Sequence, residues 1–177
     1  VFVEPILPPA TILVIGAGHV GKAVVHLAKW LGFRVTVSDD REEFCTPESV
    51  PGADAYFPVA MEKIPEQMKI NKQTYIIITS RGSNVDQEGL PGLLESNAGY
   101  IGVIGSKRRW ITTVKGLKEK GIPEEKIARV HSPMGLELNA ETPEEIAVSI
   151  LAEVLMIKAK GTGKSMKMKE KAVSSNQ

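Results

Sequence analysis

Hydrophobic and polar positions along the chain follow two alternating patterns, which predict strands joined by helices. Short, nearly continuous apolar runs are typical of strands buried on both faces of a parallel sheet. The predicted strands cover 1–6, 11–15, 33–39, 55–58, 75–79, 100–104 and 128–130. Between them, apolar residues recur at the spacing of a helix face. This alternation predicts an α/β fold with a Rossmann-like, doubly wound, mostly parallel sheet and helices on both faces.

The helices are predicted from the same pattern and from local punctuation. They cover 20–31, 61–70, 86–96, a segment after Ser106, 123–127 and a segment after Thr142. Gly89 and Pro91 are expected to interrupt the third of these helices. Thr142, Pro143 and Glu145 have the spacing of a capping box, which predicts where the last helix begins.

Three regions are expected along the chain. Residues 1–10 form an N-terminal edge strand and a proline-rich lead-in, and residues 11–157 form the Rossmann-like nucleotide- or cofactor-binding domain. Residues 158–177 form a basic, disordered tail, because lysines dominate and large apolar residues are few. Since the chain does not begin with methionine, we expect a processed piece or one part of a longer polypeptide.

A glycine turn joins the first core strand to the first long helix. In the stretch Gly16-Ala17-Gly18-His19-Val20-Gly21, Gly16 permits a tight turn and Gly18 leaves room for a phosphate. Gly21 allows the helix to pack close to the strand, and the first N–H groups of the helix face the anion. Gly16, Gly18, His19, Val20 and Gly21 are therefore candidate cofactor-binding residues.

The second strand ends in Asp39, at a spacing from the turn that suits a carboxylate binding an adenosine ribose. Asp39 disfavours a 2′-phosphate, whereas Arg41 is suited to stack on adenine or to receive such a phosphate. The alternative is that Asp39 only caps the next turn. Asp39, Asp40 and Arg41 complete this part of the candidate site.

Two further loops follow strands and are expected to reach the same crevice. Thr79, Arg81 and Gly82 follow the fourth core strand, where Arg81 is suited to a bidentate phosphate contact and Asp86 to orienting a ligand. Gly105, Ser106, Lys107 and Arg108 begin a helix whose first turn is crowded with cations. That arrangement is unfavourable unless an anion binds there. The alternatives are an ordinary strand-to-helix turn for the first loop and a solvated basic patch for the second.

Composition limits the classes of function. The formal charge is +1, so no overall field attracts nucleic acid or a membrane. The single cysteine, Cys45, excludes an intramolecular disulfide and is interpreted as a packing residue in a reducing compartment. We expect a cytoplasmic protein with neither a catalytic residue nor a metal site assigned, although His19 and His131 are each a minor catalytic candidate.

Several segments together resemble the XdhC/CoxI family of molybdoenzyme accessory factors, also called xanthine dehydrogenase accessory factors. The resemblance is to the C-terminal Rossmann domain of that family and covers about residues 1–157. It is carried by Glu4–Pro9, Gly16–Val20, Asp39–Arg41, Tyr100–Ser106, Ser132–Leu136 and Ala140–Ala147.

The resemblance implies a chaperone-like maturation role rather than turnover. Such a protein binds molybdenum cofactor of the molybdopterin type and delivers it to an apoenzyme of the xanthine dehydrogenase, aldehyde oxidoreductase or carbon monoxide dehydrogenase type. It also implies a separate N-terminal domain or chain as a partner, and we expect a homo-oligomer. The Arg-Gly-His loop of the family reads Arg81-Gly82-Ser83 here. The family's Leu-Asp-Ile-Gly turn reads Leu136-Glu137-Leu138-Asn139 in this chain, and asparagine tolerates the left-handed conformation of the glycine that it replaces.

Two alternative functions stay open. A chain with an NAD(P)-binding domain of this kind can be an NAD(P)-dependent oxidoreductase, although 177 residues leave little room for a domain that holds a substrate over the nicotinamide. A third possibility is a regulatory module in which NAD binding alters a dimer interface. The cofactor is thus predicted to be either molybdenum cofactor or NAD(P).

Overall fold

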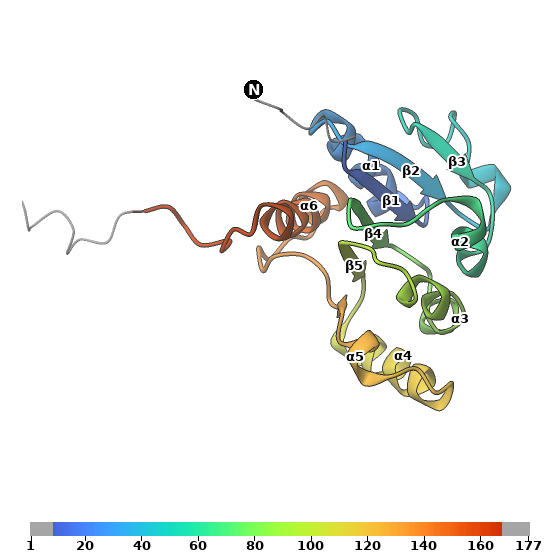
Figure 1. The fold of residues 1–177 in the computed structure, drawn as a ribbon. Helices are drawn as coiled ribbons and strands as arrows, with labels where there is room; N and C mark the ends of the chain where they lie inside the picture. Colours follow the sequence, from blue (N-terminus) through green and yellow to red (C-terminus); the bar gives the residue numbers. More distant parts are fainter. Residues whose placement is uncertain (1–8, 168–177) are drawn as a thin grey trace, which may run out of the picture.

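The chain forms three layers, with one parallel sheet between two layers of helices (Figure 1). The computed structural model describes residues 9–167, so the predicted strand over 1–6 and the end of the tail lie outside the described residues. The strands are β1 (Thr11–Ile15), β2 (Arg34–Ser38), β3 (Ala55–Phe57), β4 (Thr74–Ile78), β5 (Tyr100–Val103) and β6 (Val130–His131). Their order is β3-β2-β1-β4-β5-β6, and every pairing is parallel. The predicted doubly wound sheet is confirmed.

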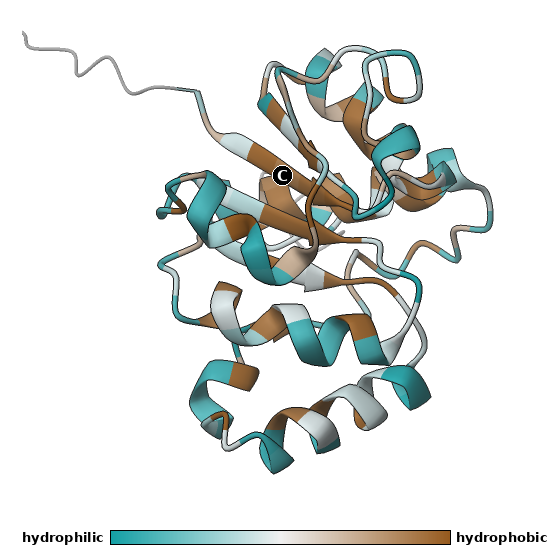
Figure 2. Ribbon diagram, turned by 90° about the vertical axis from the view of Figure 1, so that its right-hand side faces the viewer, coloured by the Kyte–Doolittle hydropathy of each residue, from teal (hydrophilic) through white to brown (hydrophobic). Residues whose placement is uncertain are grey.

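Helices cover both faces because successive strand side chains point to opposite sides. Ile12 and Val14 of β1 pack with the cluster under α1 (His19–Trp30) and α6 (Pro143–Ala159), whereas Leu13 and Ile15 pack with the opposite cluster. The second layer contains η2 (Met61–Lys63), α2 (Ile64–Gln67), α3 (Ser83–Leu94), α4 (Lys107–Glu119) and α5 (Glu124–Ile127). Figure 2 shows mostly hydrophobic strands, whereas hydrophobic and hydrophilic segments alternate along the helices. A short 3₁₀ helix, η1 (Glu42–Phe44), follows β2.

The glycine turn after β1 has the conformation that its sequence requires. Gly16 has a φ of +108°, which only glycine adopts without strain. A β carbon at Gly21 would lie 2.0 Å from the carbonyl oxygen of Gly16. The turn and the start of α1 are therefore in closer contact than any other residue type at position 21 would permit.

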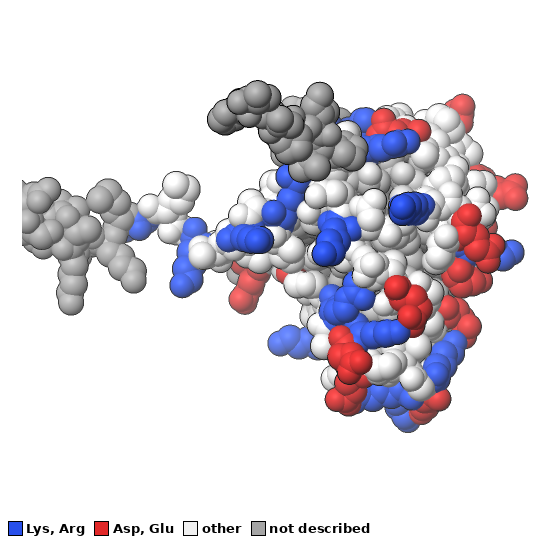
Figure 3. All heavy atoms as spheres, in the orientation of Figure 1, with Lys and Arg blue, Asp and Glu red and all other residues white. Residues whose placement is uncertain are grey.

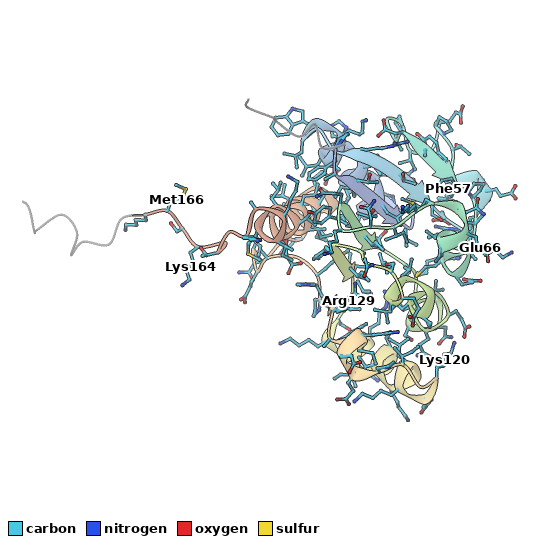
Figure 4. The ribbon with its side chains drawn as sticks, viewed as in Figure 1. Phe57, Glu66, Lys120, Arg129, Lys164 and Met166 are labelled. Atoms are coloured by element: carbon cyan, nitrogen blue, oxygen red, sulfur yellow. The ribbon has the colours of Figure 1, made fainter. Side chains whose placement is uncertain are left out.

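Helix α3 differs from the prediction, because it begins at Ser83 and continues without interruption through Gly89 and Pro91. Proline lacks the N–H that would bond to the carbonyl four residues earlier. Here Lys120 at the α4 C-terminus, which is labelled in Figure 4, supplies the missing donor. Its Nζ lies 3.1 Å from the carbonyl oxygen of Gln87. Gly89 lets Met61 pack on the helix, because a β carbon there would lie 2.4 Å from the Met61 side chain.

The start of α6 confirms the predicted capping box. Thr142 accepts a hydrogen bond from the N–H of Glu145, and the Glu145 carboxylate accepts from the N–H of Thr142, both at 3.2 Å. The helix continues to Ala159, two residues beyond the predicted end of the domain. Asn139, in the loop before it, has a φ of +51°, as expected for the position where the family has glycine.

Replacing Thr142 by alanine should lower the free energy of unfolding by about 1 kcal/mol, because the first turn of α6 loses its N-cap. Urea denaturation monitored by circular dichroism measures this loss. Thr112→Ala is the matched control, since Thr112 is exposed in the interior of α4 and alanine favours a helix there. Equal loss in the two variants would contradict a capping role for Thr142.

Candidate functional site

A cleft of about 300 Å³ opens at the carboxyl ends of β1, β2 and β4. The strand order reverses between β1 and β4, and ligands of open α/β sheets bind at such a point. Four segments line the cleft: the end of β1, the end of β2, the loop after β3 with the start of η2, and the β4–α3 connection with the first turns of α3. Their lining residues are Ile15, Gly16, Asp39, Asp40, Arg41, Val59, Ala60, Met61, Glu62, Thr79, Ser80, Arg81, Asn84, Val85 and Glu88.

The N-terminus of α1 lies beside this cleft, and no side chain caps it. Gly18 is its N-cap residue and makes no side-chain hydrogen bond, and the first turn contains no acidic residue. A β carbon at Gly18 would meet no heavy atom within 4 Å, so space is open above it. The first N–H groups of α1 are therefore available to an anion, and the helix dipole favours negative charge there. None of Gly18, His19, Val20 and Gly21 lines the cleft itself, and His19 borders the separate groove between α1 and α6.

Thr79 holds the glycine turn in place. Its hydroxyl donates to the carbonyl oxygen of Gly16 at 2.8 Å, and its own N–H bonds to Ile15 across β1 and β4. Because this hydroxyl is already engaged, Thr79 fixes the turn and offers no free hydroxyl to the cleft.

Asp39, predicted to bind a ribose, is fully engaged within the protein. One oxygen accepts from the N–H and Nε of Arg41 at 3.0 and 2.8 Å, and the other accepts from the N–H of Ala17 and Nη2 of Arg41, both at 2.8 Å. A carboxylate has about four acceptor positions, and all are used in this conformation. Arg41 is held over the ring of Phe44 at 3.9 Å. The contact with the N–H of Arg41 is the turn-capping role given as the alternative. The contact with Ala17 also ties the glycine turn to the end of β2.

These contacts make stability depend on pH. Burial of the Asp39 carboxyl opposes ionisation, but hydrogen bonds from Arg41 and Ala17 lower its pKa to about 2. Since the folded-state pKa lies below the unfolded one, this contribution is present above pH 4 and is lost as the pH falls through 2. It amounts to about 2 kcal/mol.

Urea denaturation between pH 7 and pH 2.5 should therefore show a larger acid-induced loss of stability in the unmodified protein than in Asp39→Asn. Asp40→Asn serves as the control, because Asp40 pairs at the surface with Arg81. If Asp39→Asn retained the full pH dependence of the unmodified protein, another group would be responsible.

Asp40 and Arg81 form an ion pair across the cleft mouth. Nη2 of Arg81 lies 2.7 and 2.8 Å from the two carboxylate oxygens of Asp40, and both side chains are about half exposed. Exposed ion pairs contribute little to stability. A bound phosphate can thus replace Asp40 as the partner of Arg81 at small cost.

The apolar wall of the cleft was not predicted from the sequence. Val59, Ala60 and Met61 come from the loop after β3 and from η2, and Val85 comes from α3. No motif marks these residues, because the packing of Met61 against Gly89 brings the loop to the cleft. The only signal for this packing in the sequence was a glycine, Gly89, within a helical pattern. Together with the polar loops, this wall gives the cleft one face suited to a planar ring.

The basic turn at the start of α4 does not reach the cleft. Ser106 caps α4 by accepting from the N–H of Arg109 at 3.2 Å, and Lys107 and Arg108 are exposed and make no ion pair within residues 9–167. Gly105 and Gly82 likewise lie outside the lining. Around α4 and α5, basic and acidic side chains are interspersed (Figure 3). This exposure agrees with the solvated alternative, and anion binding at this turn stays a prediction.

Arg109 has a counter-ion inside the protein. Its guanidinium donates to Asp86 at 2.7 and 3.2 Å and to the carbonyl and hydroxyl oxygens of Ser80 at 3.1 and 2.7 Å. The side chain of Asp86 is wholly buried and accepts also from the Ser80 hydroxyl. The sequence suggested that Asp86 orients a ligand. In the structure its side chain is buried and instead fixes the β4–α3 loop, which lines the cleft.

Cys45 and His131 both lie outside the lining of the cleft. Cys45 is buried with its sulfur 3.6 Å from the carbonyl oxygen of Val37, and burial raises the pKa of its thiol, which suits a packing residue. Nδ1 of His131 lies 3.2 Å from Glu153 of α6, which also accepts from Tyr100 and from the N–H of Gly135. His131 does not line the cleft.

Two kinds of feature are absent from the part of the chain that the structure describes. No cluster of three or more histidine, cysteine or acidic side chains offers a metal site there. Over the same residues, no helix combines the length and the apolar character needed to cross a membrane.

Comparison with known proteins places this geometry in context. Residues 12–154 match the family described as the XdhC Rossmann domain. The chain is 36% identical over 153 residues to "Uncharacterized protein YqeB" of Escherichia coli K12, covering 86% of this chain and 28% of that protein. It is 32% identical over 154 residues to a protein of Bacillus subtilis 168 described as a probable xanthine dehydrogenase subunit, covering 87% of this chain and 44% of that protein.

A solved structure has the same fold. It is described as a xanthine dehydrogenase from Bacillus halodurans and matches with a TM-score of 0.74 at 30% identity, covering 90% of this chain and 46% of that one. The chain therefore spans less than half the length of each of these three proteins.

Proposed function

Because this chain belongs to the XdhC Rossmann-domain family, we propose that it is an accessory factor for a xanthine dehydrogenase-like molybdenum hydroxylase. In this role it binds the molybdenum cofactor, or a nucleotide form of it, and assists its delivery to the apoenzyme. The observation that carries the proposal is the uncapped N-terminus of α1 beside a cleft with an apolar wall.

The residues present fit a ligand that combines a phosphate with a planar ring. The open space above Gly18 and the free N–H groups of α1 suit the phosphate. Arg81, at the cleft mouth, is a second phosphate ligand once it leaves Asp40. Val59 and Val85 supply apolar surface for a ring. When bound, the molybdenum cofactor brings a dithiolene and a metal centre, and this chain contributes binding, orientation and exclusion of water.

The same residues support a carrier more than an enzyme. Asp39 is saturated with hydrogen bonds, and Asp40 is neutralised by Arg81. Neither carboxylate is thus placed as a free general base, which needs an accepting lone pair within reach of a substrate proton. Binding and release of a cofactor require no such group.

Calorimetric titration of the purified chain with molybdenum cofactor, NAD, NADP and ATP tests the proposal. We expect saturable binding of molybdenum cofactor, and faster activation of a cofactor-free xanthine dehydrogenase when the chain is present. Oxidation of NADH with a carbonyl substrate, without binding of molybdenum cofactor, would instead identify an NAD(P)-dependent oxidoreductase. Binding of NAD alone, with a change in oligomeric state and no turnover, would identify a regulatory module.

A further inference from the structure

The outer face of α6 carries an apolar stripe that faces solvent. Val148, Ala152, Leu155 and Ala159 recur at alternating spacings of four and three residues, and Val148 and Leu155 are 48% and 39% exposed. The inner face of the same helix is buried in the core. A helix at the edge of a globular protein is normally polar on its outer side. A stripe at this spacing is instead the pattern by which two helices pack along their length.

Charges at the two ends of α6 have opposite sign. The exposed acids Glu141, Glu144 and Glu145 surround its start. The exposed lysines Lys158, Lys160 and Lys164 surround its end, and Lys164 is labelled in Figure 4. Glu145 serves the capping box, and none of the other five makes an ion pair within residues 9–167. The helix therefore presents an apolar stripe between an acidic end and a basic end.

This surface is complementary to an inverted copy of itself. We propose that α6 forms the interface of a homodimer, in which the two α6 helices pack antiparallel across a two-fold axis near Ala152. Val148 then faces the partner subunit's Leu155, and Glu144 faces the partner subunit's Lys158. In a parallel arrangement like charges would face each other, which is unfavourable. The antiparallel arrangement also pairs the helix dipoles favourably.

The shape around Val148 supports an inserted side chain from a second copy. A hollow of about 310 Å³ lies on one side of Val148, bordered by Leu138 and Ala140. A groove of about 450 Å³ between α1 and α6 lies on its other side, bordered by Ala23 and Leu27. Ala152, being small, permits close approach of the two helices at the axis. A helix of 17 residues is about 25 Å long, which gives the contact its length.

Analytical ultracentrifugation of the full chain over a range of concentrations tests the dimer. We expect a monomer–dimer equilibrium that Ala152→Glu weakens at least tenfold, because the two introduced carboxylates meet at the axis. Ile111→Glu is the matched control, since Ile111 is an exposed apolar residue on α4. Circular dichroism and thermal unfolding check that each variant folds. Sedimentation as a monomer at every concentration, or a dimer insensitive to Ala152→Glu, would overturn the proposal.

Two further variants establish the orientation. Glu144→Lys and Lys158→Glu should each weaken the dimer at low salt, and the double variant should restore it, because the exchanged charges again face each other. Ala152→Cys should form an intersubunit disulfide under mild oxidation, whereas Ala159→Cys should not. Failure of the double variant to restore the dimer, or efficient cross-linking at position 159, would exclude the antiparallel arrangement.

Discussion

Replacing Gly18 by aspartate should reduce the affinity for a phosphate-bearing ligand by at least tenfold without loss of folded stability. The new carboxylate occupies the N-cap of α1, accepts from its first N–H groups and adds a negative charge at the proposed anion site. A tenfold change corresponds to about 1.4 kcal/mol. Because the backbone at Gly18 is extended and nothing lies within 4 Å of its β carbon, the side chain fits without strain.

Gly18→Asn separates charge from size. Asparagine has the same shape as aspartate and caps a helix equally well, but it carries no charge. Calorimetric titration with molybdenum cofactor, and with inorganic pyrophosphate as a simpler anion, should show a smaller loss for Gly18→Asn than for Gly18→Asp. Thermal unfolding should give equal or slightly higher stability for both. Equal affinities for the aspartate variant and the unmodified chain would place the anion elsewhere.

In Gly18→Asp the ligand affinity should fall while the folded stability stays equal or rises, so a loss of affinity cannot be explained by unfolding. If the N-terminus of α1 had no role in binding, the aspartate would raise folded stability and leave ligand affinity unchanged. The absence of a cap at α1 contrasts with α6, where Thr142 and Glu145 satisfy the same N–H groups. Among the four longest helices, α1 and α3 have no side-chain cap and lie at the cleft, whereas α4 and α6 are capped by Ser106 and Thr142 and do not line it.

Local chemistry explains which parts of the fold were predictable from the sequence. The glycine turn, the capping box and the turn at Asn139 each depend on residues within one short segment, and each has the predicted form. The strands were predictable because burial on both faces produces apolar runs such as residues 75–78 of β4. The interruption predicted at Pro91 was wrong because the free carbonyl of Gln87 receives its donor from Lys120, which is distant in sequence.

The candidate site was predictable only in part for the same reason. Its backbone, from Gly16 and the start of α1, follows from the motif. The partners of charged side chains do not, because they depend on which elements become neighbours. Asp39 is saturated by Arg41 and Ala17, and Arg109 turns inward to Asp86. A sequence shows a carboxylate at the end of a strand, but not whether its oxygens are already occupied.

Replacing Asp86 by alanine should lower the free energy of unfolding by about 3 kcal/mol, because it leaves the partly buried Arg109 without its counter-ion. The chain contains a matched control in the Arg81–Asp40 pair, which has the same closest distance of 2.7 Å. The Asp86 side chain is 0% exposed and that of Asp40 is 47% exposed. Asp40→Ala should therefore cost less than about 1 kcal/mol. Urea denaturation at pH 7 measures both losses.

The double variant Asp86→Leu/Arg109→Met tests whether the loss comes from an unpaired charge. Replacing both members of a buried pair by apolar residues is often nearly neutral, so the double variant should be more stable than Asp86→Ala. Because Ser80 binds to both Asp86 and Arg109 and lines the cleft, ligand affinity should fall in every variant of this pair. Equal stability losses for Asp86→Ala and Asp40→Ala would show that burial does not determine the strength of these ion pairs.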